Sequence, residues 1–400
     1  MNIRRIDKAS SATLGRTLIL KDESFMKKIR LIFYTFIKFI LFNKNKKKYI
    51  LFSESKYYRN HFEKFIESLK KKYDKDIYYL TSDFDDYNFF KTKINTYYTG
   101  SGIIRYLTFY NFNCENLILT LTDIGNHLPK SKNCNNYIYF FHALMSTHLI
   151  YTKEAFKNYN TIFSNGTYQE KELRKAEKIF NFHQKKIINT GYFYFDYLQE
   201  SINHKIVQKN LILFAPSWNY DKNNFFDNHS SRLIRKLLDE NYSIIFRPHP
   251  EHYKRSKGIL KKIINQFGKS KHFFFDESIS NINSMEKSEV LITDNSGSML
   301  EFTLVLNRPC LCFDEIKKIH NPNYKDLDIE PLEEIFIKDF VKKLKISEIE
   351  NIREHCVNVL KNYKDSQTKV INFREKYISN IGHSVKYAMD YLVNLKNQKI

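Results

Sequence analysis

Short apolar runs separated by amphipathic stretches recur along most of the chain. A first series of apolar runs lies at 48–53, 76–82, 116–123, 136–143, 160–165 and 185–192, and a second at 210–217, 242–247, 271–277, 289–295 and 308–314. Residues with helical spacing lie between them, at 59–73, 167–180, 229–240, 255–267 and 297–306. Strands that read as continuous apolar runs and alternate with helices indicate parallel sheets covered on both faces. The pattern therefore predicts an α/β chain with two doubly wound domains.

The two series suggest where the chain divides. A length of 400 residues suits two domains better than one core. We expect a basic segment at 1–48, an N-terminal domain at 49–205 and a C-terminal domain at 206–400. Helices are expected to dominate after 331, and the last of them is long enough to reach back to the first domain. Residues 83–88 are expected to form a loop.

Charge is concentrated at the start of the chain. Of the formal net charge of +21, residues 1–48 carry thirteen Lys or Arg against three Asp or Glu. Within this segment, the apolar run 31–42 is interrupted by Thr35 and Lys38. It is shorter than the roughly 20 apolar residues needed to span a bilayer. The pattern favours an amphipathic helix at 25–48 that lies on an anionic membrane surface. An ordinary first helix of the domain with a basic flank would show a similar sequence pattern.

Neither the cysteines nor the N-terminus indicates export. The five cysteines are scattered, and Cys310 and Cys312 alternate on an expected buried strand. The apolar run has no cleavage-site pattern after it. We therefore expect reduced thiols and a cytoplasmic location.

Polar side chains gather where strands of the second series end, which is where open α/β sheets bind ligands. Residues 293–298, "TDNSGS", lie between an apolar strand and a helix, so their hydroxyls and the free N–H groups of the helix could bind an anion. Simple helix capping is the plainer interpretation. No P-loop or dinucleotide fingerprint is present. The predicted diphosphate-binding residues here are Thr293, Asp294, Ser296, Gly297 and Ser298.

Two further strand ends carry candidate residues. In "FRPHP" the prolines prevent continuation of the strand and hold Arg247 and His249 at the sheet edge. We expect this pair to act as fixed cationic donors, with Arg247 among the diphosphate-binding residues. In the first domain, His142 follows the apolar run "YIYFF", and a neutral imidazole there could accept a proton from a hydroxyl. His148 is the second candidate base. Carboxylates at 83–87 lack partners for a ligand set, so we expect no metal site.

Three blocks of the chain together resemble the CDP-glycerol glycerophosphotransferase family, which makes teichoic acids and related capsule polymers. The first is "FFHALMSTHLIYTKEAFKNYNTIFSNGTYQEKEL" with "TGYFYFDYL", and the second is "LFAPSWNY" with "FRPHPE". The third is "LITDNSGSMLEFTLVLNRPCLCFD" followed by "NPNY". The chain departs from the family pattern at Ala143, Asn295 and Gly297, which bears on the choice of donor.

The resemblance implies a GT-B-like fold of two Rossmann-like domains, with the acceptor in the N-terminal one and the nucleotide donor in the C-terminal one. It places the family's paired histidines on His142 and His249, and it adds candidate donor-site residues at Pro216, Ser217 and Glu301. It implies a CDP-linked donor, a polymer or lipid-linked acceptor and peripheral contact with the cytoplasmic face of the cell membrane through 25–48. No cofactor, metal or nucleic acid is expected, and a homo-oligomer is left open.

Three functions remain open at this point. The first is a membrane-associated transferase that moves glycerol phosphate, or a similar polyol phosphate, to a hydroxyl of a surface polymer. The second is a GT-B glycosyltransferase that uses a sugar nucleotide in capsule or lipopolysaccharide synthesis. The third is an inactive scaffold or a basic nucleic-acid binder, which salt-sensitive RNA binding would reveal.

Overall fold

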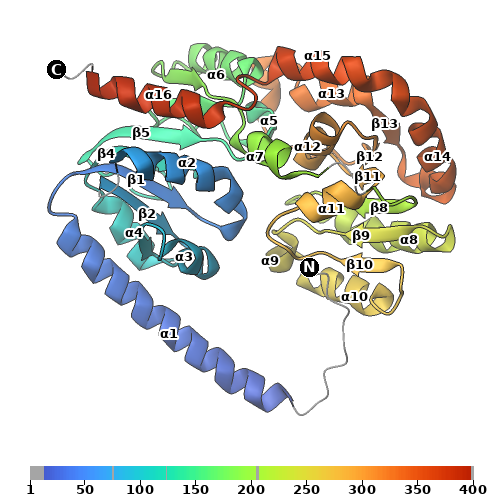
Figure 1. Ribbon diagram of the computed structural model, residues 1–400, viewed down its shortest axis with the longest axis horizontal. Helices are drawn as coiled ribbons and strands as arrows, with labels where there is room; N and C mark the ends of the chain where they lie inside the picture. The colour runs from blue at the N-terminus through green and yellow to red at the C-terminus, as the bar shows by residue number, and fades with distance from the viewer. Residues whose placement is uncertain (1–12, 74–75, 123, 204–206, 398–400) are drawn as a thin grey trace.

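Two lobes, each built on one parallel sheet, make up the protein (Figure 1). The computed structural model describes residues 13–73, 76–122, 124–203 and 207–397. The first sheet, in the order β3-β2-β1-β4-β5-β6-β7, contains β1 (Lys47–Ser53), β2 (Ile77–Thr81), β3 (Asn95–Tyr98), β4 (Cys114–Leu119), β5 (Cys134–Phe140), β6 (Thr161–Ser164) and β7 (Lys186–Asn189). The second, in the order β10-β9-β8-β11-β12-β13, contains β8 (Leu211–Phe214), β9 (Ser243–Phe246), β10 (Phe273–Phe275), β11 (Val290–Thr293), β12 (Cys310–Phe313) and β13 (Val341–Leu344). The prediction of two doubly wound α/β domains is confirmed.

Helices cover both faces of the first sheet. They are α1 (Thr13–Phe42), α2 (Arg59–Tyr73), α3 (Phe84–Phe90), α4 (Ile103–Tyr110), α5 (Thr147–Ile150), α6 (Thr167–Ile179) and α7 (Phe193–Ser201), joined by the C-terminal α16 (Ser384–Asn397). Phe62 and Phe65 of α2 pack with Leu392 of α16 against one face. Phe39 of α1 and Phe109 of α4 pack against the other. Both faces are therefore sealed by apolar side chains.

The second sheet is covered in the same way. Its helices are α8 (Phe225–Asp239), α9 (His252–Arg255), α10 (Lys257–Phe267), α11 (Ile282–Lys287), α12 (Gly297–Leu306), α13 (Leu332–Phe340), α14 (Ile352–Asn362) and α15 (Gln367–Tyr377). Short 3-10 helices lie at η1 (Lys56–Tyr58), η3 (Tyr324–Leu327), η4 (Ile346–Asn351) and η5 (Tyr363–Ser366). The core on the α12 side also contains Leu144, Met145 and Phe195 of the first domain. One hydrophobic cluster thus joins the two domains.

The basic helix α1 has one face in the core and one in solvent. The Thr35 hydroxyl donates to the Tyr98 carbonyl (2.6 Å), and Phe39 is 5% exposed. Phe33, Ile37 and Leu41 are more than half exposed. Residues 1–12 of the predicted basic segment lie outside the described residues, and so does the predicted domain boundary at 205/206. Among the helices of the described part of the chain, none is long and apolar enough to cross a membrane.

The structure corrects the sequence-based expectations at three places. Residues 84–90 form helix α3 instead of a loop, because the Asp83 carboxylate accepts the N–H groups of Asp85 (2.9 Å) and Asp86 (3.3 Å) as an N-cap. Strands β3 and β13 were not expected. Each is four residues long and lies at a sheet edge, and "NTYY" and "VKKL" lack a continuous apolar run.

The chain end returns to the first domain, as expected. After α15, residues 378–383 cross between the lobes, and α16 packs beside α2 and α7 (Figure 1). The Asp196 carboxylate of α7 accepts the backbone N–H groups of Gly382 (2.7 Å) and Ser384 (2.8 Å). This carboxylate therefore fixes the point at which the chain re-enters the first domain.

We predict that Asp196→Ala loosens α16 without disturbing the second domain. The change leaves two backbone N–H groups without their acceptor, at a cost of roughly 1–3 kcal/mol for each group that stays buried. Urea unfolding should show a lower midpoint, and limited proteolysis should release the C-terminal segment first. Asp196→Asn keeps one acceptor oxygen, so its unfolding midpoint should lie between those of the wild type and Asp196→Ala. If the C-terminal segment resists proteolysis equally in the wild type and in both variants, the role assigned to Asp196 is wrong.

Candidate active site

The carboxyl ends of both sheets border the space between the domains. His142 follows β5 of the first domain, and His249 follows β9 of the second. The Tyr192 hydroxyl of the first domain donates to the Glu301 carboxylate of α12 (2.8 Å), so this contact crosses the boundary. The positive charge of a protonated His142 contributes to lowering the pKa of His249. The two predicted histidines therefore come from opposite domains and lie close enough to interact electrostatically.

His142 is positioned by backbone contacts and by an aromatic ring. Its carbonyl oxygen accepts a hydrogen bond from His61 Nε2 (3.1 Å) and lies 3.3 Å from the Tyr192 hydroxyl oxygen. The Tyr58 ring lies against its imidazole at a centroid distance of 4.3 Å. Its Nδ1 is buried and has no hydrogen-bond partner in the described ranges of the chain. Burial lowers the pKa of His142 to about 4, so the imidazole is neutral at pH 7 and can accept a proton.

His249 is held by the turn that follows the two prolines. Its Nδ1 accepts the backbone N–H of Glu251 (3.2 Å), which leaves Nε2 to carry the ring proton. Burial, followed by the charges of Lys318, His252 and His142, lowers the pKa of His249 well below its ordinary value. At pH 7 it is therefore a neutral N–H donor, where the sequence suggested a fixed cation.

Arg247 is committed to the structure of the loop after β10. Its Nη1 donates to Asp276 Oδ2 (2.6 Å) and to the Ser278 hydroxyl (3.1 Å), and its Nη2 donates to the Ile279 carbonyl (3.3 Å). Although burial raises the pKa of Asp276, the Arg247 charge and the serine hydrogen bonds lower it overall. Arg247 thus orders residues 276–279 beside the site, and its charge is already balanced by Asp276.

Most of the residues predicted to bind the diphosphate have partners within the protein. The Thr293 hydroxyl donates to the Ala215 carbonyl (2.6 Å), so its one proton is used. Asp294 accepts the backbone N–H (2.6 Å) and the hydroxyl (3.0 Å) of Ser217. Pro216 and Ser217 are themselves buried in the loop after β8. These four residues hold the turns at the strand ends together, and none of them has a free donor directed at a ligand.

The start of α12 keeps partly exposed donors. Ser296 is the N-cap, and its hydroxyl accepts the Ser298 N–H (3.3 Å) while lying 2.8 Å from the Ser298 hydroxyl. A Cβ on Gly297 would lie 3.3 Å from Met145 Sδ, so a first-domain loop covers part of the helix start. The first N–H groups of a helix favour an anion. Ser296, Gly297 and Ser298 therefore remain together as the candidate anion site.

Glu301, one turn further along α12, is buried. Burial raises its pKa to about 7, although the hydrogen bonds from Tyr192 and Asn281 oppose the shift. Its contact with Tyr192 connects α12 to the hydroxyl that also supports the His142 carbonyl. Glu301 thus links α12 to Tyr192, which lies beside the His142 carbonyl.

Sequence reasoning missed a cation that follows β12. No hydrogen bond or ion pair of Lys318 occurs among the residues that the structure describes, and its ammonium group lies 5.7 Å from the centre of the Trp218 ring. Burial lowers its pKa to about 8, while the negative charges of Asp294 and Glu333 oppose the shift. The same Trp218 ring contacts His320 (4.7 Å between centroids) and lies beneath Arg255 (5.0 Å). The one signal in the sequence that could have identified Lys318 was its position after the carboxyl end of a strand. The segment "KKIH" after β12, however, resembles a solvated basic turn.

His148, the second candidate base, is structural. Its Nδ1 lies 3.4 Å from Glu172 Oε1, and its Nε2 lies 3.1 Å from the Ile329 carbonyl oxygen. The side chain is 2% exposed. It connects α5 and α6 of the first domain to the loop before α13.

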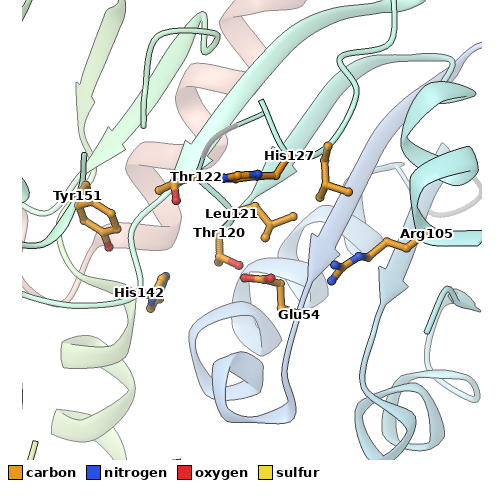
Figure 2. A pocket seen from close by; sticks show the side chains of 9 residues that line it. Glu54, Arg105, Thr120, Leu121, Thr122, His127, His142 and Tyr151 are labelled. Carbon is orange, nitrogen blue, oxygen red and sulfur yellow. The ribbon is translucent and has the colours of Figure 1, made fainter. Parts of the chain in front are cut away.

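A pocket opens beside His142 in the first domain (Figure 2). Its volume is about 340 Å³. The lining residues are Glu54, Arg105, Thr120, Leu121, Thr122, His127, Leu128, His142 and Tyr151. No residue of this group other than His142 was singled out from the sequence.

The fold of the chain is similar to that of several solved structures. The wall teichoic acid polymerase TagF matches with a TM-score of 0.60 at 16% identity over 98% of this chain and 100% of that chain. UDP-GlcNAc 2-epimerase from Neisseria meningitidis, bound to UDP-GlcNAc, matches with a TM-score of 0.57 at 12% identity over 87% of this chain and 100% of that chain. These similarities show a GT-B-like fold. Curated proteins gave no match to the chain.

The sequence also matches a family profile along most of its length. The profile describes CDP-glycerol:poly(glycerophosphate) glycerophosphotransferases, and it matches residues 32–380. The match includes both sheets, the two histidines and the start of α12. The chain therefore belongs to the CDP-glycerol:poly(glycerophosphate) glycerophosphotransferase family and is a transferase of that type.

Proposed function

We propose that this enzyme transfers glycerol phosphate, or a similar polyol phosphate, from a CDP-linked donor to a terminal hydroxyl of a teichoic-acid-like or capsule polymer. The observation that carries the proposal is the placement of His142 and His249 on opposite domains, both neutral and within electrostatic range. One can accept a proton from the acceptor, and the other can donate a hydrogen bond to the donor phosphates.

In this reaction the acceptor hydroxyl oxygen attacks the phosphorus that bears the glycerol. The hydroxyl proton passes to His142, the new oxygen–phosphorus bond forms, and the bond from that phosphorus to the bridging oxygen breaks. CMP leaves with the bridging oxygen. The Nε2–H of His249 donates a hydrogen bond to the diphosphate oxygens as negative charge develops on the departing nucleotide.

The donor phosphates are assigned to the space between His249, Lys318 and the start of α12. Lys318 supplies a positive charge that no described residue neutralises through an ion pair, and Ser296 and Ser298 supply hydroxyls at a helix N-terminus. Lys318 therefore takes over the electrostatic role that the sequence suggested for Arg247.

Peripheral contact with the cytoplasmic face of the cell membrane belongs to the same proposal. The apolar face that supports it consists of exposed side chains of α1 and α4, namely Phe33, Tyr34, Ile37, Ile40, Leu41, Ile103, Tyr106, Leu107 and Tyr110. Exposed Lys27 and Lys38 lie on the same helix α1. Contiguous exposed apolar side chains flanked by lysines suit an anionic bilayer surface.

We predict that His142→Gln lowers kcat by a factor on the order of 10²–10⁴, the usual contribution of a general base, and leaves donor affinity nearly unchanged. Because burial places the pKa of His142 at about 4, wild-type kcat/KM should stay level as the pH falls from 7 and drop only near that value. Steady-state rates with a pH series, together with calorimetric donor titration, measure both effects. Near-normal turnover of His142→Gln would remove this residue from the mechanism.

Lys318→Gln should weaken donor binding roughly tenfold or more, because a charge-assisted contact to the diphosphate is lost. Cytidine, which has no phosphate, should bind both proteins equally. In the wild type, donor affinity should fall as the pH rises past about 8, where Lys318 of the ligand-free enzyme loses its proton. Lys317→Gln is the matched control, because Lys317 already pairs with Asp314 and Glu334 at 2.6 Å each. Equal effects of the two substitutions would contradict the assignment.

Ile37→Asp with Leu41→Asp should reduce binding to anionic vesicles by a factor on the order of 10² or more, since two apolar side chains no longer enter the bilayer surface. Transfer to a short soluble acceptor should persist. These substitutions are cleaner than removal of α1, whose Phe39 belongs to the core. Val357→Asp, at an equally exposed apolar position on α14, is the control in a vesicle co-sedimentation assay. Unchanged sedimentation of the double variant would refute the membrane contact.

A further inference from the structure

The pocket beside His142 contains buried polar atoms without partners. Thr120 is 2% exposed, and its hydroxyl has no hydrogen-bond partner among the residues that the structure describes. Within the described part of the chain, Arg105 Nε and His142 Nδ1 are buried and unpartnered as well. A buried polar group without a partner costs roughly 1–3 kcal/mol, so three of them around one pocket need an explanation. A ligand that accepts hydrogen bonds would provide it.

Arg105 is the strongest of these groups. It projects from α4 into the pocket, and Glu54 projects from the opposite wall (Figure 2). The Arg105 side chain makes no ion pair or hydrogen bond with the residues that the structure describes. The Arg105 charge partly offsets the rise in pKa that burial imposes on the Glu54 carboxyl. An arginine that is free of ion pairs in a pocket matches a phosphate group, whose oxygens suit the guanidinium fork.

Glu54 adds to the pocket a group that suits the hydroxyls of a ligand and not its phosphate. Its carboxylate lies at the carboxyl end of β1 and faces the same space as Arg105. A carboxylate repels a phosphate but accepts hydrogen bonds from hydroxyl groups. The pocket thus offers one place for an anion and another for hydroxyls, with the His142 imidazole at its border. A polyol that carries a phosphodiester presents both groups.

The volume and location of the pocket agree with such a ligand. About 340 Å³ lies at the lower end of the roughly 300–1,000 Å³ of small-molecule sites, which suits one polyol phosphate unit. The residues proposed to bind the donor phosphates, Lys318, Ser296 and Ser298, belong to the other domain and do not line it. On α4, the neighbours Ile103 and Tyr106 are exposed, so Arg105 lies close to the apolar face.

We propose that this pocket binds the terminal polyol phosphate unit of the acceptor, with Arg105 and Thr120 on its phosphodiester and Glu54 on its free hydroxyls, so that one hydroxyl meets His142. This inference rests on the proposed function and adds the acceptor to it. It also implies that the enzyme extends a chain that already ends in a polyol phosphate, in preference to starting one on a neutral sugar.

The test compares two acceptors in wild type and in Arg105→Gln. One is a short glycerol phosphate oligomer, and the other is a neutral polyol of similar size. Arg105→Gln should raise KM for the oligomer roughly ten- to hundredfold, while KM for CDP-glycerol and the rate with the neutral polyol change little. Arg105→Lys should recover part of the loss, and Thr120→Val should raise the oligomer KM a few-fold. Lys91→Gln, an exposed charge on the same domain, is the control.

Binding of the oligomer without donor provides a readout that does not need turnover. In calorimetry, Arg105→Gln should abolish or greatly weaken this binding, whereas Lys318→Gln should leave it intact. An unchanged preference for the oligomer in Arg105→Gln, or an equal loss of donor affinity, would overturn the assignment. If the wild type binds the oligomer through Arg105 but transfers nothing from CDP-glycerol, the proposed function fails and the pocket assignment stands.

Discussion

A hydrophobic cluster shared by both domains fixes the geometry on which the site depends. Leu144 and Met145, which directly follow the loop of His142, are packed in one core with Met299 and Leu300 of α12. In the same loop, the Ser146 N–H donates to the Glu333 carboxylate of α13 (2.9 Å). His142, which would accept the proton, is thus held in place relative to α12, whose start would bind the donor phosphates. A domain movement that separated the two would have to expose apolar surface, at roughly 25 cal/mol per Å².

Burial also determines which protonation states the site can use. The pKa of His142 falls to about 4 and that of Lys318 to about 8, while that of Glu301 rises to about 7. In each case desolvation disfavours the charged form, and it is the largest cause of the shift. At pH 7 the two histidines are consequently neutral, the Arg247 charge is balanced by Asp276, and Lys318 is the cation beside the proposed donor phosphates. Because these groups are desolvated, the interactions of a bound diphosphate with Lys318 and the α12 start would be weakly screened.

The sequence revealed the fold and the position of the site because both depend on local pattern. Continuous apolar runs predicted nearly all strands, and the prolines around His249 marked a strand end. The individual roles were harder to predict, since they depend on partners distant in sequence. Thr293 and Asp294 looked like ligands, but their partners Ala215 and Ser217 lie on a neighbouring strand end. Conversely, nothing in "GIIRYL" distinguishes Arg105 from a surface arginine until the sheet places it opposite Glu54.

In the proposed reaction a polyol phosphate moves as a phosphoryl unit and leaves CMP behind. The most direct measurement incubates the wild-type enzyme with CDP-glycerol, other CDP-linked polyols and UDP-linked sugars, each with a glycerol phosphate oligomer, and identifies both products by mass spectrometry. The account predicts CMP in equal amount to oligomers lengthened by one polyol phosphate unit, and no reaction with the UDP-linked sugars. Release of a nucleoside diphosphate together with a glycosylated oligomer would contradict it.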